Sequence, residues 1–132
     1  MIIFMKYSYF LITMIIIIKS NDVFSQTICP GADEWNNNCY AKYTFQDGSV
    51  YEGQWHNNKP DGLGTYAFGP KSEFAGDEYL GEFKYGERHG LGSYAYSNGD
   101  KYFGRHKNNK ADGYGTYTYS KGDKYVGKFK DN

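Results

Sequence analysis

The sequence lacks an excess of charge of either sign, because its 132 residues hold 15 lysines and arginines against 15 aspartates and glutamates. A nucleic-acid phosphate backbone is bound by a concentrated set of basic side chains, so this composition argues against a nucleic-acid partner. Only three histidines and two cysteines are present. No histidine or second cysteine pair lies at metal-ligand spacing from the cysteines, which argues against a zinc site.

The sequence also lacks an uncharged run of the about 20 residues that a membrane-spanning helix needs. Its longest run, residues 7–18, lies between Lys6 and Lys19, and small side chains at Val23 and Ser25 follow. A basic start, a short apolar stretch and small residues before a cleavage point are typical of a secretory signal peptide. We therefore predict a signal-peptide helix in residues 1–25, with a retained membrane anchor as the alternative. The chain is expected to be exported, to a periplasmic or extracellular location that includes association with the cell envelope.

An exported chain with two cysteines is expected to form a disulfide between them. Cys29 and Cys39 enclose a short loop, for which the chain-entropy model gives a stabilisation of roughly 2–3 kcal/mol. Cleavage after Ser25 would leave 13 basic and 14 acidic side chains, so the mature chain would stay near neutral.

What the sequence does contain is a repeat of 23 residues, which runs from Tyr79 to Tyr102 and again from Tyr102 to Tyr125. The complete copies are residues 51–78, 79–101 and 102–124, and the first of them carries five extra residues after Phe68. Half copies precede and follow them, at 39–50 and 125–132. We expect residues 39–132 to form the repeat domain and residues 26–38 a segment fastened to it by the disulfide.

Each copy contains two short runs in which aromatic residues or glycine alternate with other residues, a period typical of β-strands. Residue types that tolerate positive φ, such as Asn57-Asn58 and Asn98-Gly99, separate these runs and predict hairpin turns. No segment shows a helical period. We therefore predict an all-β fold, a single-layer antiparallel meander of stacked β-hairpins with about eight strands.

The pattern Y-x-G-x-[WF]-x(5–6)-[HD]-G-x-G-x-[YF]-x-[YF] resembles the MORN (membrane occupation and recognition nexus) repeat. The likeness covers residues 39–132, and the opening CPGADEWNNNC resembles the head of small exported bacterial proteins of this family. Two features depart from the pattern: the five-residue insert, and His106 where the other copies have Trp55, Phe83 and Phe129. The resemblance implies a scaffold or attachment module and not a catalytic domain.

The stretch Gly90-Leu91-Gly92 could be a phosphate-binding loop, but such a loop must lead into a helix. Here a strand follows, and the same pattern recurs at Gly62 and Gly113. We predict instead that a ring from a neighbouring strand lies over each strand glycine and offsets the cost of glycine. The predicted structural repeat positions are Tyr51, Gly53, Trp55, Gly62, Gly64, Tyr66, Tyr79, Gly81, Phe83, Gly90, Gly92, Tyr94, Tyr102, Gly104, Gly113, Gly115, Tyr117, Tyr125, Gly127 and Phe129.

No catalytic constellation can be assembled from the spacing of the polar residues. His106 occupies an aromatic position, His56 a strand end and His89 a predicted turn, while Ser93, Ser97 and Ser120 lack a nucleophile motif. The carboxylates of Glu52, Glu78 and Glu82 are expected at exposed strand positions. We therefore expect no catalytic, metal-binding or cofactor-binding residues and no enzyme activity.

The remaining hypothesis is a protein-interaction or structural scaffold of the cell envelope, with an unidentified protein partner. Phe74 interrupts the repeat in the insert, and Tyr125 and Lys128 lie on the last strand, which could accept a strand from another chain. Lys128 and Lys130 could instead discourage such pairing. The alternative is binding of lipid headgroups or cell-wall glycan by the aromatic sheet face.

Overall fold

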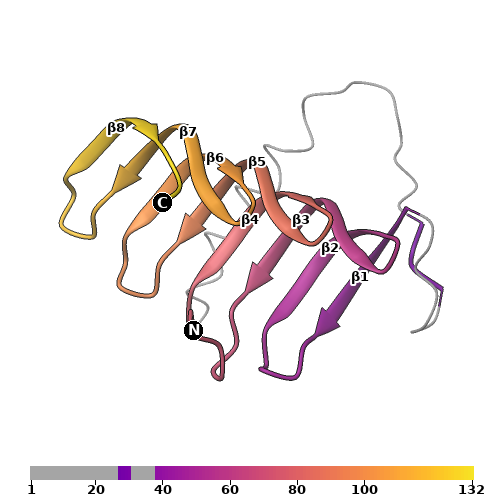
Figure 1. Cartoon of the computed structure of the whole chain (residues 1–132). Coiled ribbons are helices and arrows are strands. Elements are labelled where there is room, and N and C mark those ends of the chain that lie inside the picture. The colour runs from indigo at the N-terminus through magenta and orange to yellow at the C-terminus, as the bar shows by residue number, and fades with distance from the viewer. Residues whose placement is uncertain (1–26, 31–37) are drawn as a thin grey trace, which may run out of the picture.

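The computed structural model describes residues 27–30 and 38–132, which form one open sheet of eight antiparallel strands. The strands follow each other in sequence order across the sheet, so the predicted all-β meander is confirmed (Figure 1). The strands are β1 (Cys39–Thr44), β2 (Val50–His56), β3 (Lys59–Ala67), β4 (Glu78–Lys84), β5 (Glu87–Ala95), β6 (Lys101–Lys107), β7 (Lys110–Thr118) and β8 (Lys124–Phe129).

The turns have the positive φ angles that their residue types predict. Asn57 and Asn58 (φ 48° and 58°) join β2 to β3, and Asn108 and Asn109 (φ 49° and 68°) join β6 to β7. Two consecutive residues of positive φ match the right-handed twist of the strands that flank a two-residue hairpin loop. The loops at the other ends of the strands each contain one glycine of positive φ, as at Gly99 (φ 91°) in the β5–β6 loop.

The two faces of the sheet differ in burial. In β2, β4 and β6, buried and more exposed residues alternate along the strand, because successive side chains point to opposite faces. We call the buried side the ring face and the other side the outer face. The ring face holds Tyr51, Tyr79 and Tyr102, whose exposed fractions are 0–1%. The core of this single-layer sheet is therefore formed by the aromatic side chains that lie on its ring face.

A row of paired glycines crosses the ring face from β2 to β8. Register places Gly53 opposite Gly64, Gly64 opposite Gly81, and Gly81 opposite Gly92. The row continues through Gly104, Gly115 and Gly127. At its start, Ala41 of β1 pairs with Gly53.

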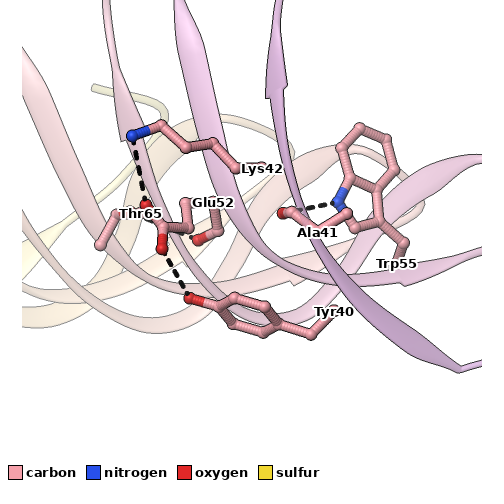
Figure 2. Close-up of polar contacts among 6 residues, drawn as sticks. All are labelled: Tyr40, Ala41, Lys42, Glu52, Trp55 and Thr65. Atoms are coloured by element: carbon pink, nitrogen blue, oxygen red, sulfur yellow. Dashed lines mark hydrogen bonds and ion pairs between the residues drawn. The ribbon is translucent and has the colours of Figure 1, made fainter. Parts of the chain in front are cut away.

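The disulfide Cys29–Cys39 fastens the preceding segment to β1, with 4.9 Å between the two Cα atoms. The backbone of this segment bonds to Tyr40, whose N–H donates to the Thr27 carbonyl at 2.8 Å. Side chains then join β1 to β2 (Figure 2): Trp55 Nε1 donates to the Ala41 carbonyl at 3.1 Å, and Glu52 accepts from Tyr40 Oη at 3.3 Å and lies 3.7 Å from Lys42 Nζ.

The predicted signal peptide, residues 1–25, lies outside the described residues. Within the described part of the chain, no helix has the length and apolar character to cross a bilayer. The disulfide is consistent with an oxidising environment.

Candidate interaction site

Tyr51, Tyr79 and Tyr102 lie on the first strand of the three complete repeats, and each covers two glycines of the ring face. A Cβ atom added to Gly64 would lie 2.6 Å from Cε2 of Tyr51, and one added to Gly53 would lie 2.5 Å from the Tyr51 hydroxyl. The ring therefore comes from the same strand for one glycine and from the neighbouring strand for the other, whereas we expected a neighbouring strand for both. The hydroxyl donates to the carbonyl three residues further on, from Tyr51 to Gln54 at 2.8 Å.

These tyrosines belong to a continuous edge-to-face ladder of rings. Tyr51 contacts Trp55 and Phe83 at centroid distances of 5.1 and 5.0 Å, and Tyr79 contacts Phe83 at 5.1 Å. The ladder continues through His106, Tyr102, Phe129 and Tyr125. Edge-to-face geometry is a favourable arrangement of aromatic quadrupoles, so the ladder stabilises the sheet beyond its buried area.

His106 fills a ladder position as an aromatic ring. It is buried between Tyr79 and Tyr102, at 4.9 and 5.0 Å, and burial lowers the pKa of His106 to about 4, with a further contribution from the Arg88 cation. Its Nδ1 is buried and has no hydrogen-bond partner among the described residues. A neutral imidazole enclosed by rings is a packing residue.

A second polar pattern, which we did not predict, joins successive repeats. Asp77 accepts from Tyr94 Oη at 2.6 Å and from the Ser97 N–H at 2.8 Å. Asp100 makes the same two bonds to Tyr117 Oη and the Ser120 N–H, at 2.7 and 2.8 Å. The signal was present as an aspartate two residues before Tyr79, Tyr102 and Tyr125, whereas Ser49 holds this position before Tyr51. Burial raises the pKa of Tyr94, and its bond to Asp77 adds to the increase.

The contacts of Arg88 were also not predicted, because no other copy of the repeat has a basic residue at this position. Its guanidinium lies 4.8 Å from the Tyr94 ring centroid, and its Nη2 donates to the Asn109 carbonyl at 2.6 Å. The Arg88 guanidinium thus packs over the Tyr94 ring near the middle of the ring face.

The structure does not bring Ser93 and His106 together as a nucleophile and a base. Ser93 pairs with Phe103 in register and lies on the outer face, whereas His106 lies on the ring face. His89 lies within β5, so its prediction as a turn residue is wrong. No group of three metal-ligand side chains occurs among the described residues.

The five-residue insert lies in the β3–β4 loop, residues 69–77, which is held by bonds within its own backbone and by the Ser49 side chain. The Asp77 N–H donates to the Phe74 carbonyl at 3.0 Å, and the Gly69 N–H donates to Ser49 Oγ at 2.9 Å. The Phe74 ring contacts Phe68 at 5.5 Å while 47% of the residue stays exposed. The insert is therefore attached to the aromatic rings of the repeat through the contact of Phe74 with Phe68.

At the other end of the sheet, β8 pairs only with β7 among the described residues. Tyr125 is 47% exposed, and its hydroxyl lies 3.5 Å from the Lys128 carbonyl, longer than the matching bonds in β2, β4 and β6. The ring face is hollowed here by a groove of about 290 Å³. Its lining residues are Tyr96, Tyr102, Ala111, Tyr117, Tyr119, Tyr125, Phe129 and Asn132.

These features define a β-hairpin repeat protein in which rings resting on glycine form the core. The model of the MORN repeat family matches residues 51–72, 79–101 and 102–124, more than half of the sequence. The chain belongs to the MORN repeat family. A comparison with curated proteins finds no significant match. MORN repeats form modules that often take part in protein or membrane interactions, and the family is in general non-catalytic.

Proposed function

We propose that this chain is an exported, non-catalytic scaffold that binds a protein partner of the cell envelope. The observation that carries this proposal is the insert, an ordered loop that presents a half-exposed Phe74 from a rigid sheet. Loops on a rigid framework commonly carry recognition, because the framework lowers the entropy lost on binding. The Cys29–Cys39 disulfide supports the exported part of the proposal.

Phe74 suits the role of an anchor residue. Its ring rests against Phe68 on one side, so its rotamer is constrained, and its exposed side offers apolar area. A constrained aromatic side chain loses little conformational freedom when a partner covers it, and such residues commonly dominate binding energy. Tyr125 and Lys128 at the open edge of β8 are the proposed second contact, where a partner strand could add to the sheet.

The test is a pull-down of envelope proteins with the exported chain and two variants. Phe74→Ser should abolish recovery of the partner, whereas Tyr85→Ser, which removes an exposed ring from the β4–β5 turn, should leave recovery unchanged. Equal recovery with Phe74→Ser and the unaltered chain would remove the insert from the proposal. A second measurement, the mass of the exported form, reports whether residues 1–25 have been cleaved.

Glycan binding is the second candidate, favoured by the groove of about 290 Å³ lined by tyrosine rings and phenylalanine. Sugar rings stack on aromatic faces, and the hydroxyl groups of tyrosine supply polar contacts. Lipid headgroups would use the same face. Co-sedimentation with insoluble peptidoglycan and with anionic liposomes separates these alternatives, and retention on neither material leaves the protein-partner proposal.

A further inference from the structure

The charges of the repeat domain are distributed unevenly along the sheet. Residues 39–100 carry nine acidic and five basic side chains, whereas residues 101–132 carry three acidic and eight basic ones. Because the strands follow sequence order, this difference becomes an acidic half around β2–β5 and a basic half around β6–β8. The near-neutral total conceals this asymmetry.

The asymmetry is sharpest on the outer face, on the two strands that flank β5. On one side, β4 presents Glu78, Leu80 and Glu82, and ends in the exposed Lys84. On the other side, β6 presents Lys101, Phe103 and Arg105, and ends in the exposed Lys107. Register places these residues in matching rows, since Leu80 and Phe103 both pair with Ser93, and Glu78 and Lys101 both pair with Ala95. The strands thus show acid–apolar–acid and base–apolar–base patterns at equal distances from β5.

The outer face also leaves apolar side chains uncovered. Leu91 of β5 is 51% exposed and Phe103 is 61% exposed, with Leu63 and Tyr114 on the strands beyond them. The ring face covers itself with aromatic rings, whereas no element among the described residues covers the outer face. Most domains bury such a face under a second layer.

We propose that a second copy of this chain supplies that layer, packed outer face to outer face around a two-fold axis that runs along β5. This rotation places β4 of one copy over β6 of the other. Glu78 then faces Lys101 of the second copy, and Leu80 faces Phe103. Glu82 faces Arg105, and each contact occurs twice because the interface is isologous.

The same rotation matches the outer strands. Leu63 of β3 faces Tyr114 of the second copy's β7, and Leu91 meets its own equivalent on the axis. Glu52 and Gln54 of β2 face β8, which presents Lys124, Val126 and Lys128. Aligned sheets cross at about 30°, so the match is tightest beside the axis, where the charge pattern is strongest.

The size of the face fits a dimer interface. Seven strands, β2 to β8, spaced by about 4.8 Å and about 20 Å long, give an area of roughly 700 Å² per copy. Stable interfaces bury about 800 Å² per partner. An anionic surface such as a membrane would use only the basic half and leave Leu63 and Leu91 exposed, whereas a second copy covers both halves.

Charge reversal with sedimentation velocity on the protein produced from the full-length chain tests the proposal. The unaltered protein should be a dimer at about 100 µM, and its dissociation constant should rise with ionic strength. Glu78→Lys and Lys101→Glu should each raise the dissociation constant at least about tenfold, because each creates two like-charge contacts per dimer. Mixing the two variants should restore a mixed dimer, since the reversed charges then face each other.

Glu73→Lys in the insert and Lys121→Glu in the β7–β8 turn are matched controls, which should leave the dimer unchanged. A monomeric unaltered protein overturns the proposal, as does a dimer that neither charge reversal weakens. A monomer that binds anionic vesicles, and loses this binding on Lys101→Glu, would assign the basic half to a membrane instead. The dimer shares Lys128 of β8 with the proposed function but uses no contact of Phe74, so its failure leaves the proposed role of the insert untouched.

Discussion

The packing of a tyrosine ring on two glycines can be tested at Gly92, in the middle of the sheet. A Cβ atom at Gly92 would lie 2.5 Å from both Cε2 and Cζ of Tyr79. Real Cβ atoms do not approach other atoms so closely, and the ring is fixed on its other side by Phe83 and His106. We therefore expect Gly92→Ala to displace the ring of Tyr79.

The expected cost follows from what the ring loses. Tyr79 is 1% exposed, and burial of a tyrosine contributes about 2–3 kcal/mol. Its hydroxyl donates to the Glu82 carbonyl at 2.9 Å, a bond worth about 1 kcal/mol. Alanine in a strand returns about 0.5–1 kcal/mol relative to glycine. The free energy of unfolding should therefore fall by about 2–3.5 kcal/mol, a large share of the stability of a small domain.

Urea unfolding of Gly92→Ala, with Ser93→Ala as the control on the opposite face of the same strand, measures this loss. Ser93→Ala should change the free energy of unfolding by less than about 0.5 kcal/mol. In a Tyr79→Leu background, which lacks the ring atoms that Gly92 accommodates, Gly92→Ala should become nearly neutral. A double-mutant cycle without a coupling energy of about 2 kcal/mol would falsify the role assigned to the glycine row.

Two further predictions concern the ends of the sheet and its buried imidazole. Replacing both Cys29 and Cys39 by serine should lower the free energy of unfolding by roughly 2–3 kcal/mol in urea titrations, and an unchanged midpoint would show that the segment contributes nothing. Burial lowers the pKa of His106 to about 4, whereas in the unfolded state this pKa is about 6.5. As the pH falls, the imidazole is therefore protonated at a lower pH in the folded state than in the unfolded state. Its stabilising contribution is complete above pH 6.5 and is lost as the pH falls towards 4, by up to about 3 kcal/mol. His106→Phe, which restores the residue type of the other copies, should flatten the urea midpoint between pH 7 and pH 4.5, and an equal slope in both proteins would refute this assignment.

The strand number and meander could be predicted from the sequence because both depend on local signals. A period of two marks each strand, and turn residues such as Asn57-Asn58 and Asn98-Gly99 need no knowledge of distant partners. Ala41 follows from the same local rule. Tyr51 covers the glycines of its own strand β2 and of the following strand β3, but not the preceding strand β1, so Ala41 of β1 can carry a Cβ atom.

Cross-strand contacts were not accessible in the same way. The bonds from Asp77 to Tyr94 and Ser97 join residues 17 and 20 positions apart, and only the register of the sheet shows that they meet. Arg88 was overlooked because it occurs in one copy alone, whereas repetition was the signal that we followed. The repeat motif suggests a turn at His89, but His89 lies within β5, and Gly90 has its positive φ (64°) inside this bulged strand.

The difference between the two faces decides where this chain can meet another molecule. On the ring face, Tyr51, Tyr79 and Tyr102 each contact two glycines, a carbonyl and at least two further rings, so a ligand there would have to compete with the core, except in the groove at β6–β8. On the outer face, Leu91 and Phe103 are 51% and 61% exposed, so their replacement by polar residues would cost the fold little. Contact with solvent alone does not account for Leu80 between two glutamates on β4 and Phe103 between two basic residues on β6. Substitutions on the outer face should therefore change binding without loss of the fold. In the insert, Phe74 contacts Phe68, so a substitution there should change both binding and stability.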